Sequence, residues 1–322
     1  MKIKTLLITA AAVALPGMAM AQMTPTISST VTLGFSSGTL DVLGTDIDLN
    51  TTSLDIDNDI AFGPNVNVGL DFGIAMTEVD TPLPIGIDVD LMSFAFEPSY
   101  HFSNGAYVGA YYRMGDLDVS VSILPVTLGV DTRQSGIFGG YENGPLWVEA
   151  FYGTSDSDPG IGAIDITDYG LAASYAVMPN LDVFGSYTRT NIDAGVLDID
   201  LSLYALGADY DFGNGLSLYG SVGRFDVGLP SFIPVSADAT MFSIGGSYDL
   251  SQAGGGFPAI VSLEMSRTSF DLAGLDADVN TFSLGLTIPL GNNGSATPLN
   301  STTQIARGQY RSAISGGLAA LR

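Results

Sequence analysis

The feature that most constrains this chain is an alternation of apolar and polar residues with a period of two. Between Val66 and Met76 every second side chain is apolar, and the residues between them are small or polar. Because successive side chains of a β-strand point to opposite faces, this pattern predicts strands rather than helices. The alternation recurs in about fourteen stretches of about ten to thirteen residues, the length of a strand that crosses a membrane at a tilt.

The connections between these stretches alternate between two kinds. Short turns such as Gly63-Pro64-Asn65 alternate with longer, Asp-rich segments, predicted as outer loops, such as Asp41–Asn50, Asp80–Asp88 and Asp271–Asp278. Membrane barrels have short periplasmic turns and longer outer loops, and their sheet must close because hydrocarbon leaves no backbone group solvated. The sequence therefore predicts an all-β, transmembrane, antiparallel up-and-down β-barrel of about 14 strands, with 12 or 16 as alternatives. A soluble sandwich or solenoid is disfavoured, because its strands would be shorter and its connections less regular.

The N-terminal segment, residues 1–21, has the features of a Sec-type signal peptide. Lys2 and Lys4 precede an apolar run from Leu6 to Leu15 that is too short to span a bilayer, and cleavage is predicted after Ala21. Residues 22–290 are predicted to form the outer-membrane barrel, and residues 291–322 a periplasmic C-terminal tail.

The tail differs from the rest of the chain in composition, because it carries Arg307, Arg311 and Arg322 in an otherwise acidic protein. Gly316 and Gly317 weaken any helix there. Disorder is the favoured interpretation. A plug in the barrel lumen and a contact with a periplasmic partner are the alternatives.

Charge and composition exclude several function classes. The net charge is −24, and both lysines lie in the signal peptide, so nucleic acid is not an expected partner. The chain has no cysteine, and its single histidine, His101, falls in a short turn on the periplasmic side. Neither a catalytic constellation nor a His/Cys metal site is therefore expected, and no cofactor is predicted.

Charged residues on the strands are the candidates for lining a pore, because a lipid-facing charge is costly. The alternation directs Arg113 inward together with four acids, while the phase of four further arginines stays open. Basic and acidic groups opposed across a pore create a transverse field that favours polar solutes. Structural salt bridges in a closed lumen are the alternative. The predicted pore-lining residues are Arg113, Arg133, Arg189, Arg224, Arg267, Asp71, Glu149, Asp168 and Glu264.

The acidic outer segments have a second interpretation. Asp46 with Asp48, and Asp88 with Asp90, could bind Ca²⁺ or bridge divalent ions to lipopolysaccharide phosphates. A solvated, self-repelling surface is the favoured interpretation. Either way, the acidic vestibule predicts a pore that prefers cations.

The last stretch carries a family pattern. Ser283-Leu-Gly285-Leu-Thr-Ile288-Pro-Leu290 resembles the β-signal that barrel-insertion machinery reads, in which a polar residue and a glycine precede alternating hydrophobic residues. With the signal peptide and fourteen strands, residues 25–290 resemble bacterial outer-membrane porin-like barrels. These barrels usually end on an aromatic residue, whereas here Leu290 closes the strand and the tail follows.

This resemblance implies a channel for passive diffusion of small polar solutes, with outer-membrane lipid and lipopolysaccharide around it. It also implies that the barrel-assembly machinery recognises Ser283, Gly285, Ile288 and Leu290. The alternative function is a structural or surface-interaction barrel with a filled lumen, acting as an anchor, antigen or adhesion surface. No oligomeric state follows from the sequence.

Overall fold

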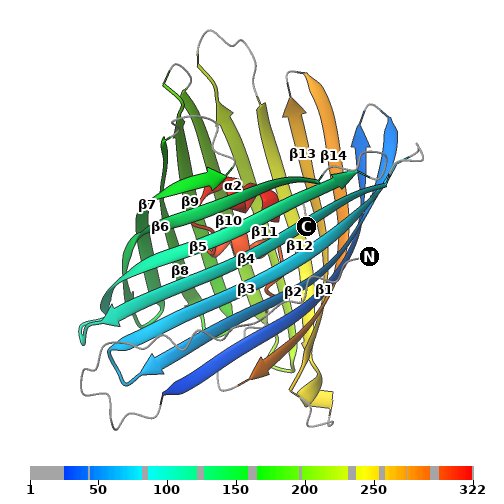
Figure 1. Ribbon diagram of the computed structural model, residues 1–322. Coiled ribbons are helices and arrows are strands. Elements are labelled where there is room, and N and C mark those ends of the chain that lie inside the picture. Colours follow the sequence, from blue (N-terminus) through cyan, green and yellow to red (C-terminus); the bar gives the residue numbers. More distant parts are fainter. Residues whose placement is uncertain are drawn as a thin grey trace.

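The chain folds into one closed β-barrel (Figure 1). Within the described residues, fourteen antiparallel strands pair in chain order, and β1 closes the barrel by pairing with β14. The predicted all-β barrel and its strand number are confirmed. The computed structural model describes residues 25–42, 44–81, 86–121, 127–158, 165–195, 198–230, 237–253, 258–272, 274–290 and 297–320. The strands are β1 (Thr26–Val42), β2 (Thr45–Phe62), β3 (Val66–Asp80), β4 (Gly86–His101), β5 (Ala106–Val121), β6 (Thr127–Asn143), β7 (Leu146–Asp158), β8 (Asp165–Met178), β9 (Leu181–Asp193), β10 (Asp198–Asp211), β11 (Leu216–Gly228), β12 (Ala237–Asp249), β13 (Ile260–Leu272) and β14 (Leu275–Leu290).

The strands are longer than the sequence pattern predicts, and the extra length lies at the end opposite the short turns. The segment 41–50, predicted as an outer loop, belongs almost entirely to β1 and β2. Between these strands the Gly44 N–H donates to Asp41 Oδ1 at 3.0 Å, and Gly44 has a φ of +77°. An aspartate that accepts from a nearby backbone N–H and a glycine with positive φ make a tight turn, so the ladder continues almost to its tip.

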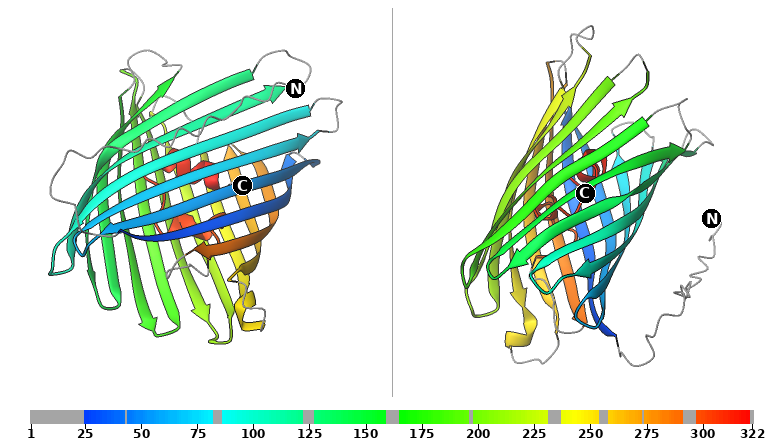
Figure 2. Two further views of the ribbon diagram at one scale, coloured as in Figure 1. Left: turned by 60° about the horizontal axis from the view of Figure 1, so that its bottom comes forward. Right: turned by 90° about the vertical axis from the view of Figure 1, so that its left-hand side faces the viewer.

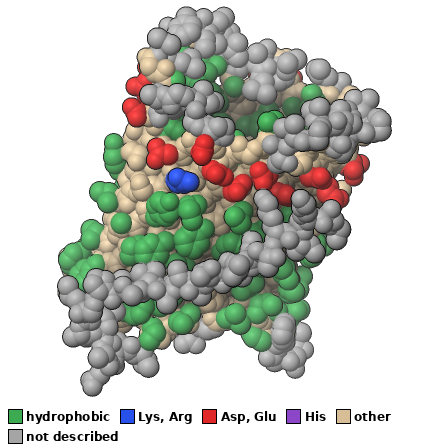
Figure 3. Space-filling model, viewed as in Figure 1, with side chains coloured by type: hydrophobic (Ala, Val, Ile, Leu, Met, Phe, Trp, Pro, Cys, Tyr) green, Lys and Arg blue, Asp and Glu red, His purple; other side chains and the backbone are tan. Residues whose placement is uncertain are grey.

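The outer surface of the barrel divides into two zones (Figure 3). Apolar side chains such as Phe35, Ile137 and Leu206 are exposed on the outward face of the strands. Above this apolar zone, acidic side chains gather towards the long strand ends. Outward aromatic residues lie near the short turns, as expected for an interfacial girdle. They include Tyr100, Phe102, Tyr141, Tyr175, Tyr210, Phe212 and Tyr248.

Residues 297–320 lie inside the barrel, and we call them the C-terminal segment. Two short helices, α1 (Thr303–Ala306) and α2 (Ala313–Ala319), lie within the ring of strands in all views (Figures 1 and 2). Outside the strands the described chain also has a 3₁₀ turn, η1 (Leu250–Ala253). Of the helices described, none has the length and hydrophobicity needed to cross a membrane.

The position of the C-terminal segment corrects the prediction of a disordered periplasmic tail for these residues and agrees with the alternative, a plug in the barrel lumen. Ala306 and Ala313 are fully buried, and Leu299, Ile305 and Ala319 are nearly so. These small apolar side chains are excluded from water by packing against the inner wall, which a free tail could not offer them. The predicted signal peptide and cleavage site lie outside the described residues.

Candidate functional site in the barrel lumen

The inner wall of the barrel carries many carboxylates. Alternation along each strand sets their side chains on the face opposite the apolar zone, and direct cross-strand partners share that face. Among the strand arginines, Arg113 has its side chain on this inner face. The acidic residues of the wall include Asp55, Asp57, Asp71, Glu97, Glu149, Asp168, Asp209 and Glu264.

Arg113 on β5 links two of these acids. Its guanidinium approaches Glu97 of β4 with Nη2–Oε1 at 2.6 Å and Asp71 of β3 with Nη2–Oδ2 at 3.7 Å. Its side chain is 17% exposed, so the three groups face the lumen rather than bulk solvent. A cavity of about 80 Å³ adjoins Arg113 and Asp71, and Gln309 and Tyr310 of the C-terminal segment also line it.

Arg311 of the C-terminal segment forms the most enclosed charge cluster of the lumen. Its Nη1 donates to Glu149, and its Nη2 lies 3.1 Å from Glu97 Oε2. The side chain of Arg311 is 6% exposed and that of Glu149 is 8% exposed. Three rings of the wall surround the guanidinium carbon, with their centroids at 5.0–5.6 Å, which is within the range of cation–π attraction. The rings belong to Tyr111, Phe138 and Phe151.

A second arginine of the segment binds another part of the wall, on β9 and β10. Arg307, which follows α1, forms an ion pair with Asp209 of β10 and lies 4.2 Å from the ring centroid of Phe184. Glu264 of β13 accepts hydrogen bonds from Ser301 and from the backbone N–H of Thr302, the latter at 3.1 Å. Charge-assisted hydrogen bonds therefore fix the segment to several sides of the barrel.

Asp168 on β8 anchors the start of α2. It accepts from Ser155 and from Thr190 Oγ1, the latter at 2.5 Å. Thr190 Oγ1 in turn accepts from the backbone N–H of Ala313 at 2.9 Å. Ser312 caps the helix, because its Oγ accepts from the N–H of Ile314. A buried carboxylate thus orients the hydroxyl that holds the first turn of the helix.

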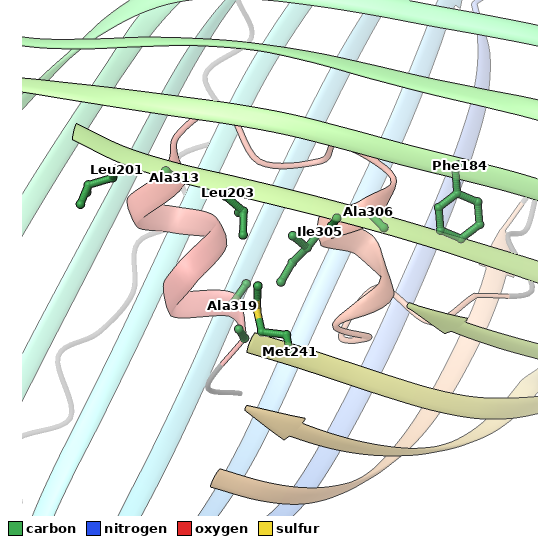
Figure 4. Packing of buried hydrophobic residues seen from close by; sticks show 10 residues of the cluster. Phe184, Leu201, Leu203, Met241, Ile305, Ala306, Ala313 and Ala319 are labelled. Carbon is green, nitrogen blue, oxygen red and sulfur yellow. The ribbon is translucent and has the colours of Figure 1, made fainter. Parts of the chain in front are cut away.

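Apolar packing completes the contact between segment and wall (Figure 4). Leu203 of β10, which is 1% exposed, packs with Met241 of β12 and with Ile305 of α1. Gly316 lies so close to Leu203 that a Cβ at this position would overlap its Cδ2. Burial of this surface contributes at roughly 25 cal/mol per Å², so hydrophobic packing and ion pairs both hold the segment in the lumen.

The structure separates the predicted pore-lining residues into two groups. Arg113, Asp71, Glu149, Asp168 and Glu264 lie on the inner wall, as the alternation indicates. The other four arginines face outward, so the prediction that they line a pore is wrong. Each lies on the outward face of its strand, beyond the apolar residues of that face and within the acidic zone. Surface aspartates form ion pairs with three of them. These residues are Arg133, Arg189, which pairs with Asp200, Arg224, which pairs with Asp226 and Asp238, and Arg267, which pairs with Asp278.

The candidate calcium ligands also face outward. Asp46 and Asp48 lie on β2, and Asp88 and Asp90 lie on β4, all on strands instead of loops. Asp90 lies directly opposite Asp118, so carboxylates repel one another across the ladder. In the part of the chain that the structure describes, no group of three or more acidic or histidine side chains is arranged to hold a metal ion.

Sequence reasoning missed Glu97 and Asp209 as wall residues that bind the C-terminal segment, and it named their partners Arg307 and Arg311 only as basic residues of the tail. One signal for them is β10, where Leu201 and Leu203 point inward while Tyr204 and Leu206 point outward. A strand that is apolar on both faces needs a partner on each face. The inner partner here is the C-terminal segment.

Comparisons with known proteins agree with this architecture. Residues 88–228 match the family described as Gram-negative porin. Among solved structures, the anion-selective porin from Comamonas acidovorans is 12% identical with a TM-score of 0.51, and the match covers 83% of this chain and 100% of that chain. The CymD monoaromatic hydrocarbon channel is 14% identical with a TM-score of 0.51, covering 85% of this chain and 91% of that chain. The search of curated proteins found no match.

The chain thus has the closed-barrel fold of the solved porins, and its residues 88–228 match the Gram-negative porin family. The resemblance predicted from the β-signal and the strand pattern is confirmed by the family match and the fold. The family match also favours a non-enzymatic role. In this barrel the C-terminal segment enters the lumen and binds its acidic wall.

Proposed function

We propose that the protein is an outer-membrane channel for the passive diffusion of small polar solutes, with a preference for cations. The observation that carries the proposal is the acidic inner wall, whose positive partners are Arg113 together with Arg307 and Arg311 of the C-terminal segment. A wall of one charge sign concentrates ions of the opposite sign in the lumen. The segment narrows the path and partly neutralises the wall.

The proposal predicts discrete but small conductance steps when the full-length mature protein is inserted into planar bilayers. With a KCl gradient across the bilayer, we expect the reversal potential to report a preference for K⁺ over Cl⁻, because fixed carboxylates repel anions. The same measurement is made on Gly308→Val, a substitution expected to displace the C-terminal segment because a Cβ at Gly308 would overlap Ala172. Absence of steps from both proteins would contradict the channel and favour a structural barrel with a filled lumen.

The same proposal places lipid and lipopolysaccharide around the barrel, with the signal peptide removed after Ala21 during export. The outward Arg–Asp pairs and the acidic zone above the apolar surface would then lie at the level of the lipid head groups. Ser283, Gly285, Ile288 and Leu290 lie on β14, the strand that closes the barrel, where the barrel-assembly machinery would read them.

A further inference from the structure

The surroundings of Arg311 form a complete receptor for a planar cation. Two carboxylates contact different nitrogens of the guanidinium, with Glu149 at Nη1 and Glu97 at Nη2. Aromatic rings of three neighbouring strands flank it. Every member of this set comes from β4–β7, so the receptor belongs to the barrel wall and its occupant to the C-terminal segment. We call the set Glu97, Tyr111, Phe138, Glu149 and Phe151 the guanidinium cage.

We propose that the guanidinium cage is a binding site of the channel wall for solutes that carry a guanidinium group, and that Arg311 is its built-in occupant. This inference deepens the proposed function, and it rests on that function for the access of solutes through the lumen. The ligand class follows from the chemistry of the cage, which matches a flat, weakly hydrated cation with donors on separate nitrogens.

The cage is held in shape by contacts that do not involve Arg311. Tyr107 OH donates to Glu149 Oε2 at 3.0 Å, and Arg113 Nε donates to Glu97 Oε1 at 2.8 Å. The rings of Tyr111 and Phe151 pack edge to face with their centroids 6.2 Å apart. Because each carboxylate keeps a second partner, the cage should persist when its occupant is removed.

The charge of the vacated cage favours a cation. Glu97 and Glu149 carry two negative charges, and the one positive charge of Arg113 is shared between Glu97 and Asp71. Removing Arg311 therefore leaves an excess of negative charge in a nearly dry site, where a missing cation is costly. A guanidinium fits better than an ammonium or K⁺, because planar cations stack on aromatic rings and donate in fixed directions.

Chemical rescue of the full-length Arg311→Ala protein tests this inference. The barrel's unfolding midpoint is measured from its heat-modifiable migration on gels, with millimolar guanidinium chloride, KCl or urea present. Arg311→Ala should lower the unfolding midpoint. We expect guanidinium to reverse at least half of this decrease, while KCl and neutral, planar urea reverse none of it. The wild-type protein should not respond, because Arg311 already fills its cage.

Two control variants make the test specific. Arg267→Ala also removes an arginine from a carboxylate, but on the outer surface, and it should show no guanidinium effect. Arg311→Ala combined with Glu149→Gln should lose most of the rescue, because one of the two acceptors is no longer charged. If Arg311→Ala does not fold alone, its refolding yield with guanidinium against KCl replaces the midpoint.

Equal effects of guanidinium and KCl on Arg311→Ala, by either measurement, would overturn the inference. The measurement reports binding, so it does not depend on ion conduction. A rescued variant without conductance steps would count against the proposed channel and leave the cage in place. Conductance without rescue would count against the cage alone.

Discussion

Replacing Arg311 with alanine is expected to destabilise the barrel by about 3–5 kcal/mol, the usual cost of leaving a buried ion pair without one partner. Glu149 loses its cation and keeps only the hydroxyl of Tyr107. Glu97 keeps Arg113, so the loss should fall near the lower end of that range. The free energy of unfolding can be measured in urea from the fluorescence of Trp147, the single tryptophan, which packs against the aromatic cluster that contains Tyr107 and Phe138.

Arg267→Ala is the matched control for this measurement. Arg267 also binds a carboxylate, with Nη2 2.8 Å from Asp278 Oδ2, but its side chain is 58% exposed. An exposed pair is screened by water and contributes less than about 1 kcal/mol. Equal losses from the two substitutions would show that burial of Arg311 adds nothing to the strength of its ion pairs.

The barrel could be predicted from the sequence because the membrane and the lumen impose opposite demands on successive residues. Stretches such as Val66–Met76 carry that alternation without interruption, so strand number and closure follow. The outer ends of the strands carry a weaker signal, because both of their faces meet water. There the sequence suggests loops of 41–50 and 271–278, whereas pairing continues to tight turns at Gly44 and Gly274.

The outward direction of the strand arginines could be predicted from the apolar residues that precede them on the same strand face. Val261, Leu263 and Met265 occupy the outward face of β13, and Arg267 follows at the next position of that face. Leu218 and Val222 precede Arg224 on β11 in the same way. The residues that precede these arginines therefore indicate an outward side chain, not one that lines a pore. Above the apolar zone, an outward arginine meets aspartates and solvent instead of lipid, so it is not costly there.

The C-terminal segment could not be placed from local pattern. Its helices have four and seven residues, far below the length at which a helix is stable in water by itself. Their stability comes from contacts with strands more than one hundred residues away, such as Ser312 with Thr190. Gly316 and Gly317 argue against a helix in isolation, yet Gly316 is what allows α2 to approach Leu203.

Gly308→Val is expected to expel the C-terminal segment from the lumen and to raise the single-channel conductance several-fold. Gly308 follows Arg307 at the end of α1 with a φ of +76°, a conformation that a β-branched residue adopts only with strain. A Cβ at Gly308 would also overlap the Cβ of Ala172 on the wall strand β8. With Arg307 and Arg311 withdrawn from the acidic wall, the preference for K⁺ over Cl⁻ should increase as well.

Gly44→Val separates the two causes of this effect. Gly44 has nearly the same φ, +77°, but a Cβ there would meet open space, so the substitution imposes backbone strain without a clash in the lumen. Its conductance should match the wild type. Adding Ala172→Gly to Gly308→Val should return part of the conductance to the wild-type value, because the main steric conflict is relieved while the strain remains. If Gly308→Val and Gly44→Val conduct alike, the segment does not limit the pore, and ions pass by a path that residues 297–320 do not obstruct.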